Sequence, residues 1–278
     1  MRILNEDEEK SVLYMYKNGV RVCDIAKKLH CRAKTISDTL KKNNITPKKA
    51  RTNSWFLNED YFDEINSPEK AYFIGLLFTD GSVGLDKGGR SPNIRLEIAE
   101  QDCCVLYMLR DELNICNALS YSKRKGRNGT YTLSVRSEKL AKSLEKYNIV
   151  PNKTYLSDRL PSVPEEYIRP FVHGLIDGDG SVYFSRGIWH INFCSHFESI
   201  CREFETICSS LISKDFHPKI QESNGVYRIT YNGQWAKKLA KECLTDNYGI
   251  ARKRLLAEQM FEDKVAEDIV YSTSKDAV

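Results

Sequence analysis

Two short stretches of sequence decide the fold, FIGLLFTDG at residues 73–81 and VHGLIDGDG at residues 172–180. Each has a glycine in an apolar setting and ends in Asp-Gly, and their matching residues lie 99 positions apart. The tetrapeptide KLAK recurs at the same offset, at residues 139–142 and 238–241. Two separated blocks that share one offset indicate that the chain carries two copies of one module.

Both copies show the same order of predicted elements. Each begins with a short apolar helix, over about 71–79 and 170–178, and continues with two strands, a helix, two more strands and a closing helix. The strands are indicated by residues that alternate between apolar and polar, so that one face packs on the helices. The sequence therefore predicts an α+β fold of two pseudo-symmetric αββαββα repeats, at residues 55–160 and 161–262.

The polar face of these strands is rich in Arg, Asn, Thr and His in both copies. For one strand such a face is merely solvated, but four strands in two copies favour a recognition surface, because a β-sheet can read bases in the major groove. The hairpin loop at 121–129 holds four basic residues and no acid, which suits contact with phosphates. The residues that we predict to contact DNA here are Arg95, Lys123, Arg124, Lys125, Arg127, Thr132, Ser134, Arg136, His190, Asn192, Arg228, Thr230 and Asn232.

Gly75 and Gly174 lie inside helical patterns, where a glycine costs roughly 1 kcal/mol relative to alanine. That cost indicates the close approach of another backbone. We therefore expect the two apolar helices to pack on each other through these glycines. Asp80 and Asp179 then fall at the two helix C-termini, each followed by a glycine in the usual C′ position.

An aspartate at a helix C-terminus faces the negative end of the helix dipole, at a cost of about 0.3–1 kcal/mol. Two such groups brought together, Asp80 and Asp179, also repel each other. A hard divalent cation with oxygen ligands, Mg²⁺ or alternatively Mn²⁺, compensates both effects. Metal ions held between carboxylates and a scissile phosphate support hydrolysis. The duplicated pair is thus predicted to bind catalytic metal.

The two quoted stretches resemble the LAGLIDADG motif of homing endonucleases, and the likeness extends over residues 55–262. It implies a monomeric, pseudo-two-fold enzyme of mobile elements and intron homing, whose two antiparallel sheets form a saddle over double-stranded DNA. The implied reaction is hydrolysis of one phosphodiester in each strand, across the minor groove of a long and nearly asymmetric target, leaving 3′ overhangs.

The resemblance also assigns residues at the site. Asp80 and Asp179 match the metal-binding acids of the family, and Thr79 and Gly178 would lend backbone carbonyls to the metal. The first stretch departs from the motif, since Phe78 and Thr79 stand where the family has an acidic and a small residue. Both acids that bind metal are present, so cleavage is expected.

Three further assignments follow from the resemblance alone. Glu100 occupies a position where the family often has glutamine, and Lys139 and Lys238 are candidates for basic residues near the cleavage pocket. For each lysine taken alone, a place on a helix surface is the alternative.

The N-terminal part of the chain differs from the repeats in charge. Residues 1–54 contain 13 Lys and Arg against 6 Asp and Glu, whereas the whole chain has a net charge of +4. The stretch NGVRVCDIAKKLHCRAKTISDTLKKNNI, residues 18–45, shows two short helices joined by a tight turn, with Ile36 and Leu40 buried in the second. It resembles the trihelical helix-turn-helix of resolvases and sigma-like regulators, with a helical cap on the main domain as the alternative. The predicted DNA contacts of this module are Arg32, Lys34, Thr35 and Ser37.

These patterns divide the chain into segments. Residues 1–46 form the predicted helix-turn-helix domain, 47–54 a basic linker, and 263–278 a polar tail after the two repeats. No apolar run approaches the roughly 18–20 residues needed to span a bilayer. We expect no membrane association and a cytoplasmic location, in a bacterial or phage-infected cell or in an organelle.

The nine cysteines form no CxxC pair, which favours reduced thiols over a disulfide or zinc framework. The group His190, Cys194, His196 and Cys201 has a spacing that matches no common zinc site, so core cysteines and DNA-facing histidines are the favoured interpretation.

The main alternative function is a DNA-binding protein that does not cleave, either a transcription regulator or an intron maturase on the same scaffold. That alternative predicts loss of the metal-binding acids, and the presence of both Asp80 and Asp179 argues against it. A bifunctional endonuclease and maturase stays open, as does the role of the helix-turn-helix. The target sequence is not readable from the chain.

Overall fold

The computed structural model describes the chain in two compact units, Met1–Leu57 and Asn58–Val278. The described residues are 4–17, 20, 22–29, 31–45, 57–84, 92–115, 119–123, 126 and 128–273. The predicted linker 47–54 lies outside them.

The described residues of the N-terminal unit form the helices α1 (Glu6–Lys17), α2 (Val22–Lys28) and α3 (Ala33–Lys42). Ile36 and Leu40 of α3 are fully buried in its core, as predicted. Helices α2 and α3 follow each other closely along the chain, and α3 ends in two lysines.

The first repeat follows the predicted order of elements. It consists of α4 (Pro68–Thr79), β1 (Gly81–Gly84), β2 (Asn93–Ala99), the short 3-10 helix η1 (Glu100–Asp102), α5 (Cys104–Glu112), β3 (Ser120–Ser122), β4 (Thr130–Arg136) and α6 (Glu138–Glu145). The four strands form one antiparallel sheet in the order β1-β2-β4-β3.

The second repeat has the same plan. After α7 (Lys153–Leu156) and η2 (Glu165–Tyr167) come α8 (Ile168–Asp179), β5 (Gly180–Ser185), β6 (Ile188–Ser195), α9 (Glu198–Ile212), β7 (Ile220–Ser223), β8 (Val226–Asn232) and α10 (Gln234–Cys243). Its antiparallel sheet has the equivalent order β5-β6-β8-β7. The prediction of an α+β fold with two αββαββα repeats is confirmed.

One face of each sheet builds a core. In the first repeat Leu96 and Leu133 of the sheet meet Leu77 of α4, Leu109 of α5 and Leu140 of α6. Along β2 and β4 the buried side chains that face this core alternate with more exposed ones, as the period-two pattern predicted. In the second repeat α8, α9 and α10 cover the equivalent face.

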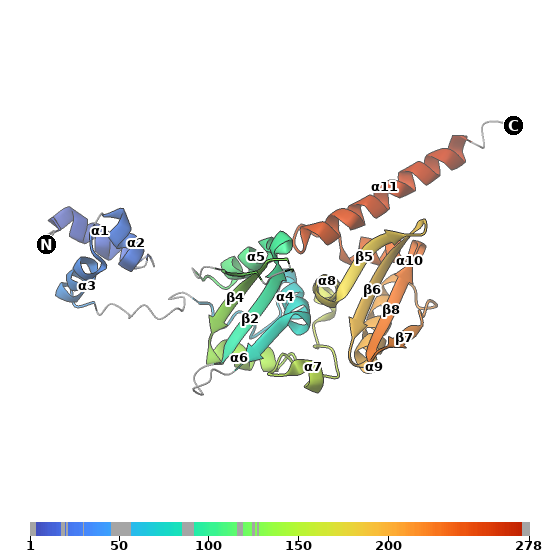
Figure 1. The fold of residues 1–278 in the computed structure, drawn as a ribbon, viewed down its shortest axis with the longest axis horizontal. Coiled ribbons are helices and arrows are strands. Elements are labelled where there is room, and N and C mark those ends of the chain that lie inside the picture. Colours follow the sequence, from blue (N-terminus) through green and yellow to red (C-terminus); the bar gives the residue numbers. More distant parts are fainter. Residues whose placement is uncertain are drawn as a thin grey trace. The chain divides into compact units, whose positions relative to one another are not determined.

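Helices α4 and α8 pack against each other between the two sheets (Figure 1). A Cβ atom on Gly75 would collide with the carbonyl oxygen of Phe171, and one on Gly174 with the carbonyl oxygen of Tyr72. The backbones therefore touch where the sequence has glycine, which confirms the predicted contact.

The glycines that follow the two aspartates have a different role from the one predicted. Gly180 has extended backbone angles, φ −102° and ψ 169°, and is not a left-handed C′ residue. Instead, a Cβ on Gly180 would lie 2.6 Å from the Ile176 carbonyl oxygen, and one on Gly81 would collide with the Leu77 carbonyl. Glycine is needed because, in each repeat, the backbone turns directly from the helix into the strand and passes close to the last turn of that helix.

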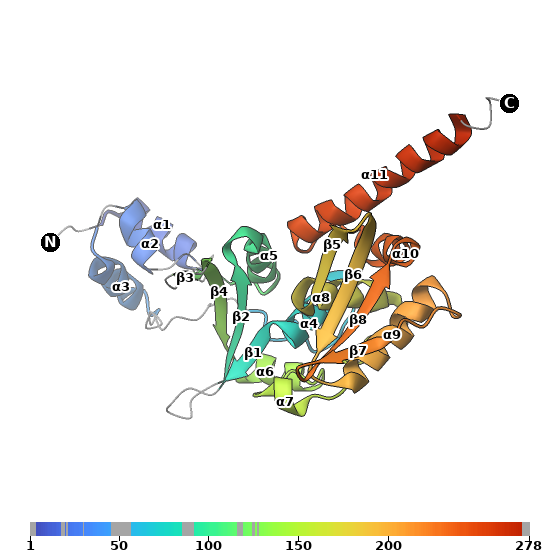
Figure 2. The same cartoon turned by 45° about the vertical axis from the view of Figure 1, so that its right-hand side comes forward.

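The final helix, α11 (Ala251–Thr273), starts beside α8 and leads away from both sheets (Figure 2). Ala257 and Met260 anchor its first half in the core. The helix runs into the predicted polar tail, whose backbone is helical as far as Thr273. Among the described residues no helix is long and apolar enough to cross a membrane.

Candidate active site and nucleic-acid interface

Asp80 and Asp179 end the two central helices, where the sequence placed them. Asp80 is the C-cap of α4, and its N–H donates to the Leu76 carbonyl at 2.9 Å. Asp179 is the last residue of α8. Both residues are exposed to solvent, although protein atoms surround them densely. The close contact of the helices thus brings both carboxylates to one region at the centre of the unit.

The pKa of each carboxyl is raised in the folded chain. Burial and, secondarily, the charge of Asp179 raise the pKa of Asp80 to about 6. Burial also raises the pKa of Asp179, while Lys153, Lys253 and His196 act in the opposite direction. Ionising both groups is therefore costly until positive charge is supplied.

Two buried lysines close the ends of the same helices. The Lys153 amine donates to the carbonyl oxygen of Thr79 at 2.7 Å. The Lys253 amine donates to the carbonyl oxygens of Ile176 and Asp177 at 2.7 Å and of Gly180 at 2.8 Å. A cation at a helix C-terminus satisfies carbonyls that have no partner within the helix, so each lysine stabilises one end of the helix pair beside the carboxylates.

Sequence reasoning missed these lysines. They occupy equivalent turns, because the Lys153 N–H donates to Val150 and the Lys253 N–H donates to Ile250, each three residues earlier. Their offset is 100 and not 99, so a fixed period does not pair them. A one-residue shift allowed after the second KLAK block would have revealed them.

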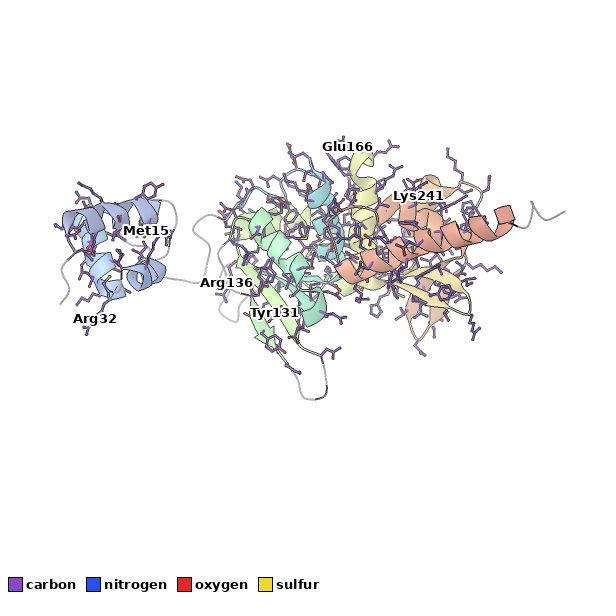
Figure 3. The ribbon with its side chains drawn as sticks, turned by 90° about the horizontal axis from the view of Figure 1, so that it is seen from above. Met15, Arg32, Tyr131, Arg136, Glu166 and Lys241 are labelled. Carbon is purple, nitrogen blue, oxygen red and sulfur yellow. The ribbon has the colours of Figure 1, made fainter. Side chains whose placement is uncertain are left out.

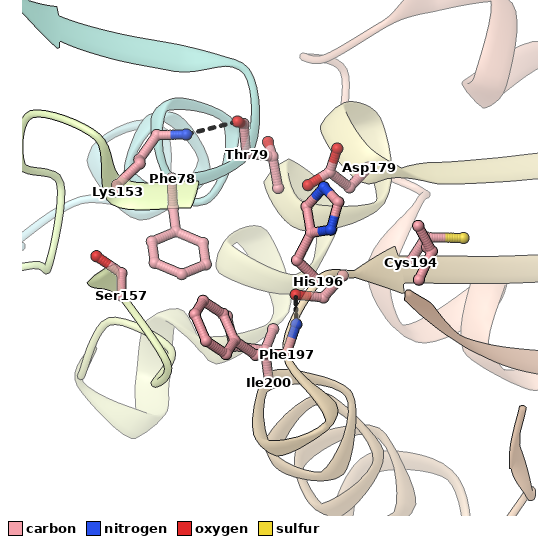
Figure 4. A pocket seen from close by; sticks show the side chains of 11 residues that line it. Phe78, Thr79, Lys153, Ser157, Asp179, Cys194, His196, Phe197 and Ile200 are labelled. Carbon is pink, nitrogen blue, oxygen red and sulfur yellow. Dashed lines mark hydrogen bonds between the residues drawn. The ribbon is translucent and has the colours of Figure 1, made fainter. Parts of the chain in front are cut away.

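One pocket lies between Lys153 and Asp179 (Figure 4). Its floor is apolar, with Phe78, Phe197 and Ile200 packed together, and its rim carries His196 beside Asp179.

A second pocket lies at the other carboxylate and is more polar. Asp80 and Lys253 line it, together with Glu97 at the end of β2. Its wall also includes Asp102, which forms an ion pair with Arg252 at 3.0 Å. The carboxylate pair is thus flanked by two pockets that have equivalent positions in the two repeats.

The structure places the other predicted catalytic residues elsewhere. Lys139 pairs with Asp60, and Lys238 lies over the Trp235 ring, 4.3 Å from its centroid. Both occupy the outer helices α6 and α10, which agrees with the alternative of helix-surface lysines. Glu100 accepts a hydrogen bond from the Tyr121 hydroxyl at 3.1 Å and is not among the residues that line either pocket.

The polar faces of the two sheets gather most of the predicted DNA contacts. Strand register places Arg95 beside Ser134 in the first sheet, and His190 beside Asn232 in the second. Cross-strand neighbours share a face. The same faces carry Thr132 and Arg136, and Arg228 and Thr230, respectively. Figure 3 shows Arg136 and Tyr131 near opposite ends of β4.

Two predicted contacts are buried. Asn192 is 7% exposed and its side-chain oxygen accepts from the Ser181 hydroxyl at 2.7 Å, so it supports the sheet. Thr35 is 9% exposed, because it lies on the side of α3 that packs inward with Ile36 and Thr39. Arg32, by contrast, is exposed at the start of α3 (Figure 3). Lys34 is exposed as well.

Two further predicted contacts are described, and three are not. Ser37 is half-buried and donates to the Ala33 carbonyl, and Lys123 is exposed. Arg124, Lys125 and Arg127 lie outside the described residues.

The possible zinc ligands do not form a metal site. Cys201 is buried and donates to the Tyr227 carbonyl, while Cys194 accepts from the Arg228 guanidinium at 3.4 Å. In the described part of the chain, no three His, Cys, Asp or Glu side chains are grouped so as to hold a metal.

The sequence matches no protein-family model and no curated protein. Among solved structures, variants of the homing endonuclease I-DmoI are 16% identical, with a TM-score of 0.45, over 69% of this chain and 99% of theirs. The LAGLIDADG meganuclease I-AabMI bound to uncleaved DNA is 13% identical, with a TM-score of 0.44, over 74% and 92%. The LAGLIDADG homing endonuclease I-LtrWI bound to target DNA is 12% identical, with a TM-score of 0.44, over 77% and 92%. The chain resembles LAGLIDADG homing endonucleases.

Proposed function

We propose that the chain is a metal-dependent, site-specific endonuclease that cuts double-stranded DNA. The observation that carries this proposal is the pair Asp80 and Asp179. Two helices whose backbones touch bring these carboxylates together, between two sheets that each have a polar face. The pKa of Asp80 is raised to about 6 there, so its charged form is disfavoured unless a cation is bound.

The residues present fit a divalent cation. Both carboxylates are accessible, they repel each other, and hard cations such as Mg²⁺ and Mn²⁺ prefer oxygen donors. The backbone carbonyls of Thr79 and Gly178 are further candidates, although the Thr79 carbonyl already accepts from Lys153. When bound, the metal would supply charge that activates water and stabilises the leaving oxygen in phosphodiester hydrolysis.

The chain's own residues would hold and orient the substrate. The exposed guanidinium groups of Arg95, Arg136 and Arg228 suit phosphates or guanine edges, and the adjacent Thr and Asn side chains suit base edges. Because one chain contains both carboxylates, a monomer would cut both strands. The two repeats differ in sequence, so their target would be long and nearly asymmetric.

The N-terminal unit would add a second DNA contact. Arg32 and Lys34 are exposed at the start of α3, the second helix of the predicted helix-turn-helix. The first residues of such a helix are the ones that meet base edges in the major groove.

The test is digestion of a randomised DNA library by the purified full chain with Mg²⁺, with parallel reactions in EDTA and with Asp80→Asn/Asp179→Asn. Metal-dependent cuts at one long site that the double variant does not make are the expected result. Tight site-specific binding without cuts would instead indicate a regulator or a maturase.

A second experiment concerns the N-terminal unit alone. Without residues 1–57 the chain should bind the recovered site more weakly and with a shallower dependence on salt, since fewer phosphates are neutralised. Arg32→Ala/Lys34→Ala in the full chain should give the same change. An unaltered salt slope in both would show that this unit does not contact DNA.

A further inference from the structure

The contact between α4 and α8 differs in chemistry on its two sides. On one side of the contact three positions hold polar side chains. The equivalent three positions on the other side, each 99 residues away in the sequence, hold apolar side chains. The polar set is Tyr72, His173 and Asp177, and the apolar set is Phe171, Ile74 and Phe78.

The polar side is a buried hydrogen-bond network centred on Asp177. Its carboxylate oxygen Oδ2 accepts from the Tyr72 hydroxyl at 2.8 Å and from the Ile250 N–H at 2.7 Å. The His173 ring lies against it, with Nε2 at 3.4 Å, and stacks on Tyr248. The network therefore joins the first repeat, the second repeat and the segment that enters α11.

The segment that enters α11 carries Lys253, which lines the pocket at Asp80. Ile250 begins the turn in which the Lys253 N–H donates to the Ile250 carbonyl at 3.0 Å. Fixing Ile250 on Asp177 sets the start of α11, from which the Lys253 amine reaches the end of α8 beside Asp179. A buried carboxylate that accepts from two donors holds such a turn more firmly than packing alone.

Among the side chains that the structure describes, the other pocket has no equivalent of this hydrogen-bond network. Phe78 takes the place of Asp177, and its ring packs with Phe197 and Ile200. A phenylalanine cannot accept from the turn that carries Lys153. Any effect of the network should therefore fall on one pocket only.

We infer that Asp177 and Tyr72 are positioning residues that hold Lys253 for cleavage of one of the two DNA strands. The inference rests on the proposed endonuclease function. Losing the network should slow cutting of the strand served by the Asp80 and Lys253 pocket, while the strand served by the Lys153 pocket is cut at its normal rate.

The experiment uses the full chain and a supercoiled plasmid that carries its target. Tyr72→Phe removes only a hydroxyl and should slow the cutting of one strand by roughly tenfold, equivalent to about 1.4 kcal/mol of transition-state stabilisation. Nicked circles should accumulate, and sequencing of the ends should place the nicks in a single strand. Tyr231→Phe is the matched control, because Tyr231 is also fully buried but belongs to the core of the second sheet; it should give linear product at the normal rate.

Asp177→Asn provides a second variant and should slow the same strand. Binding of uncut DNA in Ca²⁺ and thermal unfolding should be measured in parallel, and a variant is compared only if it melts and binds DNA like the unaltered chain; Tyr72→Phe, which removes one hydroxyl, is the variant that meets this condition most readily. Equal slowing of both strands, or no slowing by either variant, would overturn the inference. If the unaltered chain cuts neither strand, the proposed function itself fails, and this appears in the reference reaction before any variant is compared.

Discussion

The two pockets beside the carboxylate pair share a framework and differ in their surroundings. In each, a lysine on an equivalent turn closes the end of a central helix. Lys253 donates to three carbonyls, whereas Lys153 donates to one. The wall of the Lys253 pocket includes the ion pair between Asp102 and Arg252, whereas the floor of the Lys153 pocket is apolar. The framework places the carboxylates, while the surroundings set how firmly each lysine is held.

The contrast shows what a duplication within one chain permits. The glycine contacts of α4 and α8 occur on both sides, because the two backbones touch symmetrically. The side chains around them need no symmetry, since each half of the interface has its own sequence. The Asp177 network on one side and the Phe78 cluster on the other are two solutions to the same packing problem.

The largest expected effect concerns what the two pockets share. Asp80→Asn and Asp179→Asn should each abolish double-strand cutting, by at least about a hundredfold, because charge stabilisation worth several kcal/mol is lost. Cleavage assays and DNA binding should be measured for both variants, with binding retained. Continued cutting of both strands by either variant would remove the metal assignment for that residue.

The next effect is on stability and should be symmetric. Gly75→Ala and Gly174→Ala each place a methyl group on a carbonyl of the facing helix, and the backbone there cannot give way easily. We expect a loss of about 3 kcal/mol or more in the free energy of unfolding, measured with denaturant. Gly84→Ala, in β1, is the control, because nothing lies within 4 Å of its added Cβ. A tolerated Gly174→Ala would contradict the close contact.

The sequence predicted the elements that its local pattern specifies. Period two identified the strands, and the glycines at 75 and 174 identified the helix contact, because a helical glycine needs a packing reason. The aspartates followed from their place at the helix ends. Each of these signals is carried by residues close together in the chain.

The other residues of the site depend on features that a fixed period hides. Strand register pairs Leu96 with Gly81 but Phe193 with Gly180, so equivalent positions in β2 and β6 are 97 apart and not 99. Lys139 and Lys238, which keep the offset of 99, lie on the outer helices α6 and α10 and line neither pocket. The sequence does not distinguish a buried lysine such as Lys253 from a surface lysine, and only the carbonyls around its amine reveal its role.

A smaller difference should separate the two lysines. Lys253→Met leaves three carbonyls without their donor and Lys153→Met leaves one, so Lys253→Met should lower the free energy of unfolding by about 1–3 kcal/mol more. Methionine keeps the length of the side chain, so packing changes little. Denaturant unfolding of both variants measures the difference, and equal losses would mean that the additional hydrogen bonds contribute nothing.

The smallest effect is the pH dependence of stability without metal. The pKa of Asp80 is raised from 3.8 to about 6 in the folded chain, so the folded state binds this proton more tightly than the unfolded state. Stability is therefore lost as the pH rises from about 4 through 6. Asp80→Asn removes that loss, and in EDTA at pH 7 it should melt a few degrees higher than the unaltered chain. In a unit of this size each kcal/mol of unfolding free energy shifts the melting temperature by about 2–4 °C.

The gain should be modest, because solvent screens an exposed carboxylate, and it should vanish below pH 4. Asp179→Asn should gain less, since Lys153, Lys253 and His196 already oppose the rise in the pKa of Asp179. Added Mg²⁺ should reverse the order of Asp80→Asn and the unaltered chain, because the cation then compensates a repulsion that the asparagine has already removed. If Asp80→Asn melts lower in EDTA at pH 7, the pKa of Asp80 is not raised in the folded chain, and the electrostatic case for a metal at this site fails.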